Sequence, residues 1–543
     1  MISRQRVAFG DWQTPRALAD AAIDALVRRG GKRPATVVEP TCGHGVFLRA
    51  AAARWPRARL RGYDINAEYV DSAAAALPRT AKLEVADFFR VDWEEELRRL
   101  PEPLLVVGNP PWVTSAELGA IGASNLPRKQ NFKKLNGLDA RTGKSNFDVS
   151  EWMLLRLLAA LQGRDATVAM LCKASVARRV IEFAASQSLH VSPIGLWRID
   201  AEAHFSAAVD ALLFACRTQR AEAAALASQA KRAGAAERGS HKRRAEAVPL
   251  ERNTKRAGAA WFATGATRAA PASLERHMEL AGAAGEWPVF ARLDAAAAEA
   301  SIGIVDGVLA SDVRAFRETQ HLAGVCRPEW RSGVKHDYAA VMELSGRNGE
   351  LVNGFGEVVE IEEALIYPLL KSSDLANGRT ARKHVIVPQT VLGQDTAALR
   401  STAPRAWRYL TKHRALLDGR KSSIYRGQPP FALFGVGDYT FAPWKVAISG
   451  LYKRLEFCLV GPTDGRPTLV DDTCYFLPFQ RAAEARTALR ALCSELAHAF
   501  FEARIFWDAK RPISKALLQS VDLGKLCIAA STAASTTQEA FAF

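Results

Sequence analysis

A short apolar run, a glycine-rich turn and a helical pattern, in that order, most constrain what this chain can fold into. Residues 36–39 read as a buried strand, Gly43 and Gly45 lie in the following turn, and an Ala- and Arg-rich helical stretch comes next. This succession is typical of the nucleotide-binding unit of a doubly wound sheet, where glycines let the backbone approach a ligand. The dinucleotide form is excluded, because Leu48 occupies the third glycine position.

Two more candidate strands end in acidic residues. The run at residues 60–64 closes on Asp64, whose carboxylate can accept hydrogen bonds from both hydroxyls of a ribose. The next run closes on Asp87 and Phe88, an acid and an aromatic ring that suit an adenine. A single acid at a strand end is more often only solvated, but three strand ends in order indicate a nucleotide-like ligand.

A fourth apolar run, residues 104–108, leads into Asn109, Pro110, Pro111 and Trp112. An amine conjugated to a ring is a poor nucleophile, because its lone pair is delocalised. The side-chain oxygen of Asn109 and the carbonyl of Pro110 can accept the amine hydrogens and draw the lone pair out of conjugation. Proline fixes φ and holds that carbonyl rigidly, while Trp112 offers a flat face for a planar substrate. The alternative interpretation is a proline-stiffened turn.

In this order the motifs resemble those of gamma-class DNA amino-methyltransferases of the N6-adenine type, the methylases of type II restriction–modification systems. The resemblance rests on residues 13–15, 39–45, 64, 87–88 and 109–112. It implies S-adenosylmethionine as cofactor and double-stranded DNA as partner, with no metal. The residues that it implies for the cofactor are Thr14 and Glu39 at the methionine end, Gly43 and Gly45 in the turn, Asp64 on the ribose, and Asp87 and Phe88 on the adenine.

The same family places an aromatic residue on the other face of a base flipped out of the duplex, and Phe205 matches that position. The resemblance therefore implies a catalytic set of Asn109, Pro110, Pro111, Trp112 and Phe205. Adenine enzymes more often carry Tyr or Phe where this chain has Trp112, so N4-cytosine methylation stays open. Methyltransferases acting on RNA or on protein glutamine share the motif, although they usually lack a C-terminal half of this size.

We expect an α/β fold, in which a Rossmann-like methyltransferase domain with a mixed, mostly parallel sheet precedes a C-terminal α+β target-recognition domain. The expected boundaries are 1–217 for the methyltransferase domain, 218–285 for a basic Ala-rich linker or insertion, 286–480 for recognition, and 481–543 for a helical segment and tail. Within the first domain we predict a helix over 147–161 and strands over 166–172 and 210–216. Near the C-terminus we predict a closing helix over 481–506 and a frayed tail from residue 529.

The net charge of +16 favours a nucleic-acid partner, because Lys and Arg attract phosphate through counterion release. Part of this charge lies in the 218–285 segment, for which a solvated linker is the simpler interpretation. A basic stretch at 128–134 either closes over the flipped base or is a solvated loop. The candidate DNA-binding residues of the second half are Arg331, Lys335, Lys371, Arg420, Lys421, Tyr425 and Arg426.

Other classes are disfavoured by residues that the chain lacks. None of the 8 cysteines follows a proline, which argues against C5-cytosine methylation, and none forms Cys-x-x-Cys, which argues against zinc. No Glu-x-Lys occurs, so a nuclease is expected as a separate restriction endonuclease rather than in this chain. Without a long apolar run or a signal-like start, we expect a cytoplasmic protein with no membrane partner.

Overall fold

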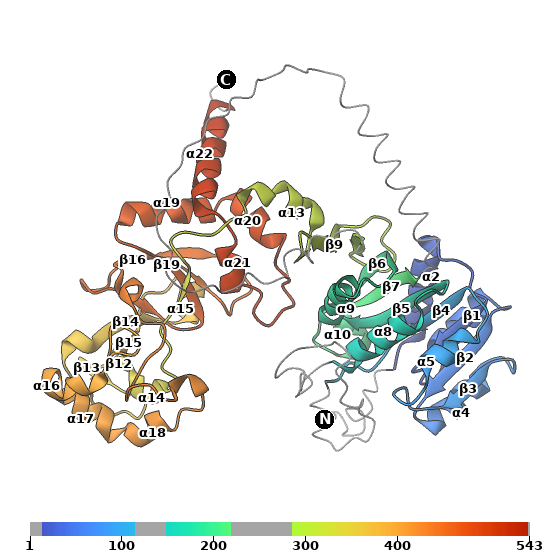
Figure 1. Ribbon diagram of the computed structural model, residues 1–543, viewed down its shortest axis with the longest axis horizontal. Helices are drawn as coiled ribbons and strands as arrows, with labels where there is room; N and C mark the ends of the chain where they lie inside the picture. The colour runs from blue at the N-terminus through green and yellow to red at the C-terminus, as the bar shows by residue number, and fades with distance from the viewer. Residues whose placement is uncertain (1–12, 115–147, 219–284, 541–543) are drawn as a thin grey trace, which may run out of the picture. The chain divides into compact units, whose positions relative to one another are not determined.

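The computed structural model describes residues 13–114, 148–218 and 285–540 (Figure 1). The chain divides into two compact units, residues 1–309 and 310–543, which are considered separately below.

The first unit is built on a ten-stranded sheet in the order β10-β9-β8-β6-β7-β5-β4-β1-β2-β3. From β3 to β5 all neighbours are parallel, whereas β7 is antiparallel to both β5 and β6. This is the expected mixed, mostly parallel sheet. Its strands are β1 (Thr36–Glu39), β2 (Arg59–Asp64), β3 (Lys82–Val85), β4 (Leu104–Gly108), β5 (Ala166–Lys173), β6 (Val191–Ile199), β7 (Ala211–Thr218), β8 (Trp287–Phe290), β9 (Ala300–Val305) and β10 (Val308–Ala310).

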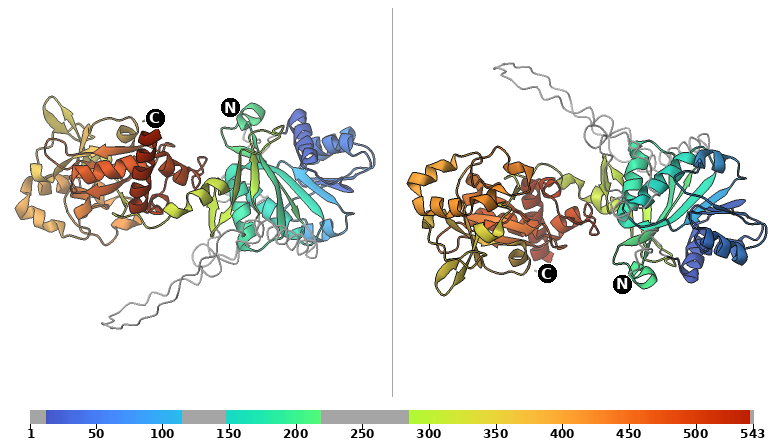
Figure 2. Two further views of the ribbon diagram at one scale, coloured as in Figure 1. Left: turned by 90° about the horizontal axis from the view of Figure 1, so that it is seen from above. Right: turned by 90° about the horizontal axis from the view of Figure 1, so that it is seen from below.

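Helices cover both faces of this sheet, as Figure 2 shows. Because strands buried on both faces have no solvated side, β4 and β5 are almost continuously apolar. One face packs against α2 (Arg16–Arg28), α3 (Val46–Arg54), α4 (Ala67–Ala76) and α10 (Ala201–Phe205), and the other against α5 (Trp93–Arg98), α8 (Val149–Ala160) and α9 (Ala174–Ser186).

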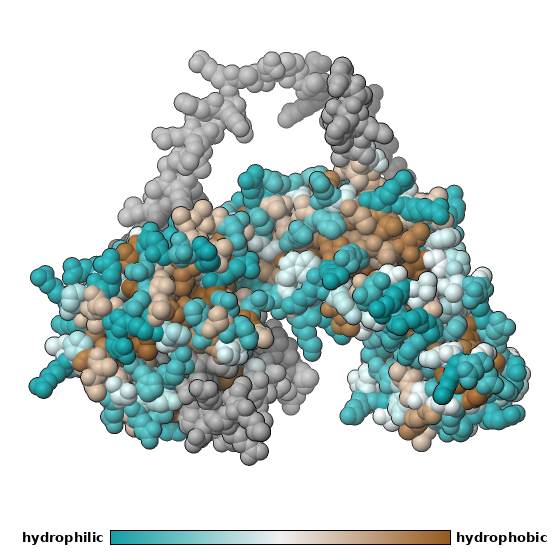
Figure 3. Space-filling model, turned by 180° about the vertical axis from the view of Figure 1, so that it is seen from behind, coloured by the Kyte–Doolittle hydropathy of each residue, from teal (hydrophilic) through white to brown (hydrophobic). Residues whose placement is uncertain are grey.

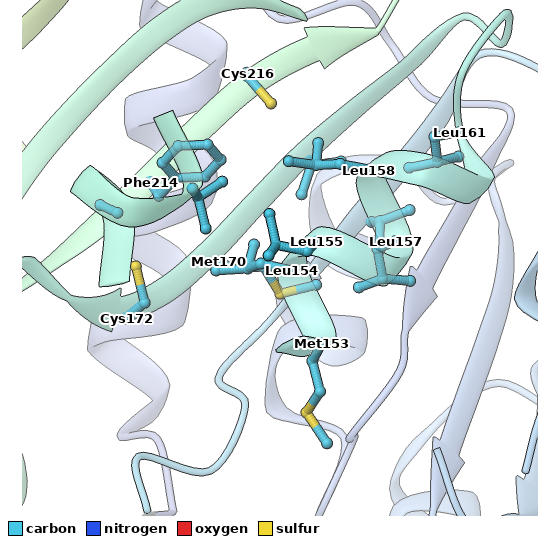
Figure 4. Close-up of a cluster of buried hydrophobic side chains, with 14 of the residues drawn as sticks. Met153, Leu154, Leu155, Leu157, Leu158, Leu161, Met170, Cys172, Phe214 and Cys216 are labelled. Atoms are coloured by element: carbon cyan, nitrogen blue, oxygen red, sulfur yellow. The ribbon is translucent and has the colours of Figure 1, made fainter. Parts of the chain in front are cut away.

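Helix α8 shows how sequence spacing produces this packing. Its residues Leu154, Leu155 and Leu158 lie against Met170 of β5 and Phe214 of β7 in one buried cluster (Figure 4). Apolar side chains three to four residues apart share one face of a helix, so the run 147–161 was readable as a helix from its sequence. The helix buries that face against β5 and β7.

The sheet extends beyond the expected end of the methyltransferase domain. Strand β8 pairs with β6 in parallel and β9 pairs with β8, so residues 287–310 belong with the first sheet and not with a recognition domain that begins at residue 286. Strand β6 had no predicted counterpart, because Pro193 and Gly195 interrupt its apolar run at a β-bulge.

The second unit holds two smaller sheets, of order β11-β19-β16-β17 and β13-β12-β15-β14-β18. Helices and strands are mixed without regular alternation, which makes this unit α+β as expected. Its strands are β11 (Arg331–Ser332), β12 (Glu343–Arg347), β13 (Glu350–Val352), β14 (Ile366–Leu370), β15 (Lys383–Ile386), β16 (Trp444–Ser449), β17 (Phe457–Val460), β18 (Leu469–Val470) and β19 (Cys474–Phe479).

The helices of this unit are short until its C-terminal part. They are α13 (Val313–Glu318), α14 (Ala339–Met342), α15 (Ser372–Ala376), α16 (Leu399–Thr402), α17 (Pro404–Lys412), α18 (Arg414–Asp418), α19 (Ala482–Leu492), α20 (Glu495–Glu502), α21 (Lys515–Gln519) and α22 (Leu523–Ala540), with 3-10 turns η2 (Gln320–Leu322), η3 (Glu363–Leu365), η4 (Thr396–Ala398), η5 (Ser423–Tyr425) and η6 (Asp438–Phe441).

Two expectations for the C-terminus were wrong. The predicted closing helix is two helices, because Ser494 caps the start of α20 by accepting a hydrogen bond from the backbone N–H of Ala497. The predicted frayed tail is largely helical, since α22 continues to Ala540.

Apolar side chains in both units gather in buried clusters, and hydrophilic residues cover most of the face shown in Figure 3. Within the described part of the chain, no helix combines the length and the apolar character needed to cross a bilayer.

Candidate cofactor and methyl-transfer site

A cavity lies at the carboxyl ends of β1, β2, β3 and β4. Ligands of doubly wound sheets bind at this edge, at the point where the strand order reverses, which here is between β1 and β4. The lining brings together six predicted cofactor residues and two residues of the catalytic motif. These are Thr14, Glu39, Gly43, Asp64, Asp87 and Phe88, with Asn109 and Pro111.

Asp64 is held at the end of β2 by two backbone amides. Its Oδ2 accepts from Gly43 N at 2.8 Å and its Oδ1 accepts from Asn66 N at 2.9 Å. A carboxylate is an acceptor with about four positions, which suits the donor hydroxyls of a ribose. The turn needs glycine, because Gly43 and Gly45 have φ of 48° and 68°.

Gly45 shapes this turn but does not line the cavity. A Cβ at Gly45 would lie 3.1 Å from the Ala73 side chain. Gly45 therefore lets α3 start close to α4, and its contribution to the cofactor site is indirect.

Glu39 is almost fully buried, and its Oε2 accepts from Leu48 N at 3.1 Å. Burial raises the pKa of Glu39 well above its usual value, and the negative charge of Asp64 adds to this, against a lowering by the Leu48 amide. A buried acid beside a second carboxylate in one cavity is suited to a cationic ligand. Burial also raises the pKa of the neighbouring Cys42 thiol, which leaves it protonated and a poor nucleophile.

Beyond the end of β3, Asp87 and Phe88 close the other end of the cavity. The Oδ1 of Asp87 accepts from Phe89 N at 3.0 Å, and the carboxylate lies 3.4 Å from the Nε of Arg90. The ring of Phe88 is buried and packs on Trp93 with ring centroids 4.8 Å apart. An acid beside an aromatic wall is the environment predicted for an adenine ring.

Asn109 follows β4 directly and lies at the same cavity. Its Nδ2 donates to the Thr14 Oγ1 at 3.3 Å, which occupies the donor end of the amide and orients the acceptor oxygen. Pro111 also lines the cavity, while Pro110 is buried and lines a smaller void beside Phe88. Catalytic and cofactor motifs are therefore continuous in space.

Trp112 and Phe205 lie together but do not form an open slot. Their rings meet edge to face with centroids 5.1 Å apart, and both side chains are buried. The indole Nε1 of Trp112 donates to the backbone oxygen of Leu171 at 3.3 Å. No base fits between two rings in contact, so the expected stacking of a base on both is absent from this arrangement.

Several lining residues were not predicted. Ile65, Asn66 and Tyr69 follow Asp64, and Met153 comes from α8. The position of Ile65 directly after an acid at a strand end was a usable signal, because the carboxyl ends of strands line the ligand site in such sheets. Nothing in the sequence marked Met153 as a lining residue, because its spacing along the helix is also that of a core residue.

The structure places the predicted DNA-binding residues in the second unit, and three of them in ion pairs. Lys335 lies 2.7 Å from Asp337 and Lys371 lies 2.7 Å from the buried Glu343. Burial by itself would lower the pKa of Lys371, but its bond to Glu343 and the nearby Asp471 raise it overall. The third is Arg331, which pairs with Glu329 at 2.8 Å.

The remaining four residues divide into a fixed pair and an exposed pair. Arg420 donates to the carbonyls of Leu417, His336 and Ala432 and lies 3.7 Å over the Tyr425 ring. It therefore supports the loop, although it was expected to bind phosphate. The other two, Lys421 and Arg426, directly follow Arg420 and Tyr425 in the chain and are exposed.

The sheet order and the motifs at the ends of β1 to β4 define an S-adenosylmethionine-dependent methyltransferase. No protein-family model matches the chain. Over 530 residues it is 37% identical to the type II methyltransferase M.NspV from Nostoc sp. (strain ATCC 29411 / PCC 7524), which is 96% of this chain and 98% of that protein. The chain belongs to the type II methyltransferases.

Two further likenesses are weaker. The type II methyltransferase M.CvrRI from Paramecium bursaria Chlorella virus XZ-6E is 29% identical over 117 residues, 21% of this chain and 27% of that one. The type IIL restriction–modification enzyme MmeI in complex with DNA has a TM-score of 0.49 and 12% identity, over 93% of this chain and 64% of its own.

The lining of the cavity suits the cofactor of this family. The carboxyl groups of Glu39 and Asp64 would suit the ammonium group and the ribose hydroxyls of S-adenosylmethionine, and the apolar side chains of Ile65, Phe88 and Phe89 would suit its adenine ring. A cationic ligand offsets the cost of burying Glu39 beside a second acid.

Proposed function

We propose that this type II DNA methyltransferase methylates the N6 amine of adenine in duplex DNA, as part of a modification or restriction–modification system. The observation that supports it best is the position of Asn109 and Pro111 on the cavity that also holds Glu39, Asp64 and Asp87. An amine bound by the motif would stand next to the methyl donor, because the strand ends of β1 and β4 are adjacent.

Asn109 and Pro110 prepare the amine. The Asn109 side-chain oxygen accepts one amine hydrogen and the Pro110 carbonyl accepts the other, which localises the nitrogen lone pair toward the cavity. Thr14 keeps the amide from rotating by accepting from its Nδ2. When bound, S-adenosylmethionine supplies an activated methyl group, so the chain needs neither a metal nor a covalent nucleophile.

The base must leave the duplex to reach Asn109. For Trp112 and Phe205 to stack on it, their edge-to-face contact has to open when DNA binds. Aromatic pairs contribute about 0.5–1.5 kcal/mol beyond their buried area, a cost that base stacking of about 1–3 kcal/mol can offset.

The second unit is proposed to recognise DNA. Lys421 and Arg426 are exposed cations that directly follow Arg420 and Tyr425 in the chain, so their charges can reach phosphates without unfolding the loop. Lys335 and Lys371 would first have to exchange a carboxylate partner for a phosphate.

The substrate is tested by methylating unmodified genomic DNA with the purified chain and S-adenosylmethionine, digesting it to nucleosides and separating these by mass. We expect N6-methyldeoxyadenosine. N4-methyldeoxycytidine alone would contradict the adenine assignment while keeping the site. Methylation of RNA or protein without DNA methylation would contradict the substrate class.

A further inference from the structure

Strand β5 is longer than its neighbour β4 at the cavity edge. Gly108, the last residue of β4, pairs with Met170, and β5 continues to Lys173. The final residues of β5 therefore run beside the segment Asn109–Trp112, with which they form two hydrogen bonds. Trp112 Nε1 donates to Leu171 O at 3.3 Å, and Lys173 Nζ donates to the backbone oxygen of Trp112 at 2.9 Å.

The Lys173 ammonium is fixed from its other side by a buried acid. Its Nζ lies 2.9 Å from Asp148 Oδ2, and the Asp148 side chain is 4% exposed. Asp148 is itself anchored, because its Oδ1 accepts from Ser150 N at the start of α8. Charge-assisted hydrogen bonds of this kind are about twice as strong as neutral ones, so the lysine is a stiff link between α8 and the motif.

The link acts on the part of the motif that meets the amine. Pro110 and Pro111 have fixed φ angles, so few rotations separate the Pro110 carbonyl from the Trp112 carbonyl that Lys173 holds. A second hydrogen bond joins α8 to this segment, because Val149 N donates to Val113 O at 2.9 Å. Fixing Trp112 therefore limits the directions in which the Pro110 carbonyl can point.

We propose that Lys173, held by Asp148, is a positioning residue that aims the Pro110 carbonyl and the Asn109 side chain at the amine. The inference rests on the proposed use of these two acceptors but not on which base carries the amine. Lys173 itself touches neither cofactor nor amine. Its removal should slow methyl transfer, because small misplacements of reacting groups can cost about 100-fold in rate.

A second, more exposed lysine–aspartate pair at the opposite end of the same strand provides the control. Lys32 lies 2.6 Å from Asp165, the residue before β5. Both pairs join a lysine to an aspartate beside one strand, but the Lys32 pair is remote from the cavity. A general weakening of the sheet would lower the melting temperature of the variant, whereas loss of positioning should slow methyl transfer only in Lys173→Met.

The test measures tritium transfer from S-adenosylmethionine to unmodified genomic DNA in a single turnover, with cofactor affinity by calorimetry and thermal melting on the same samples. We expect Lys173→Met to lower the rate constant ~10- to 100-fold with cofactor Kd within about twofold of wild type. Asp148→Asn should lower it less, Lys173→Arg should restore much of it, and Lys32→Met should not change it.

A wild-type rate constant in Lys173→Met would overturn the proposal. So would loss of cooperative melting or of cofactor affinity in that variant, because the lysine would then serve the fold. Counting tritium does not depend on which base is methylated, so this result is separate from the nucleoside analysis that tests adenine.

Discussion

The amide nitrogen of Asn109 lies 3.3 Å from the hydroxyl of Thr14, joining the end of β4 to the segment that precedes α2. One contact thus connects the Asn109–Trp112 motif with Thr14, which lines the same cavity. The motif and the segment before α2 are therefore coupled through side chains and not only through the sheet.

Asn109→Ala should abolish methylation while leaving binding intact, because an acceptor is lost but no cavity wall collapses. Tritium transfer, cofactor calorimetry and DNA gel shift on the same protein measure this. Thr14→Val is a milder variant of the same contact. It should lower kcat by about tenfold or less, because one hydrogen bond of about 1 kcal/mol is lost. Near-normal turnover in Asn109→Ala would show that the active site lies elsewhere.

Asp64→Ala should weaken S-adenosylmethionine binding by about 1–3 kcal/mol, the scale of hydrogen bonds to a charged acceptor. Part of the loss would come from the turn, because Asp64 also accepts from Gly43 N and Asn66 N. Asp64→Asn keeps an acceptor oxygen and should lose less. Unchanged affinity in both variants, measured by calorimetry, would move the ribose site away from β2.

Cofactor affinity should rise with pH because of Glu39. Burial, first, and then Asp64 raise the pKa of Glu39, so at mildly acidic pH the free protein carries a proton there. A cationic ligand lowers that pKa, and binding must release the proton. Affinity should therefore increase as pH rises from the ordinary carboxyl range toward the raised value and then level off.

Calorimetry in two buffers of different ionisation heat counts the released protons directly. In Glu39→Gln the release should vanish and the pH dependence should flatten over the same window. Proton release that persists in Glu39→Gln would assign it to another group.

Replacing both Lys421 and Arg426 with Ala should weaken duplex binding and reduce its dependence on salt, because each phosphate contact adds about 0.9 to the slope of log affinity against log salt. Cofactor binding should not change. The same charge removed from α19, at the exposed Arg486 and Arg490, is the control. Equal effects of the two double variants would indicate only a general electrostatic attraction.

Glu343 should matter for the stability of the second unit. It is 2% exposed and pairs with Lys371 at 2.7 Å and Lys383 at 2.8 Å. Burial would raise its pKa, but His336, Lys371 and Lys383 together lower it. A lowered carboxyl pKa contributes stability that is present above the ordinary value and is lost as pH falls below it.

Glu343→Ala should therefore lower the free energy of unfolding by about 2–4 kcal/mol near neutral pH, a figure reduced for the partly exposed lysines. Chemical denaturation at neutral and acidic pH measures it. The difference from wild type should shrink in acid, and a constant difference would mean that packing rather than charge is responsible.

The sequence was sufficient where function depends on the ends of strands. Four apolar runs predicted β1 to β4, and the residues after them, including Glu39, Asp64 and Asn109, meet at one cavity. The fold and the cofactor were confirmed. The side-chain roles and the recognition role of the second unit stay predictions, as do adenine, the endonuclease partner and the absence of a metal.

Burial and pairing could not be predicted, because they depend on contacts between distant segments. Trp112 was expected to present its face, but Leu171 and Phe205 enclose it. Arg420 was expected to bind phosphate, but carbonyls from two other segments and Tyr425 occupy it. A local pattern gives the type of side chain and not its partner.

Strand β6 pairs with β7 along one edge and with β8 along the other. Thr218 of β7 lies opposite Val191, and Val289 of β8 lies opposite Leu196. The end of β7 and the start of β8 therefore lie on either side of β6, only a few residues apart along it. At ~3.3 Å per residue and ~4.8 Å per strand, roughly 15 Å of chain would join them. About five residues could make that connection, so the pairing of β7, β6 and β8 does not require a segment as long as residues 219–284.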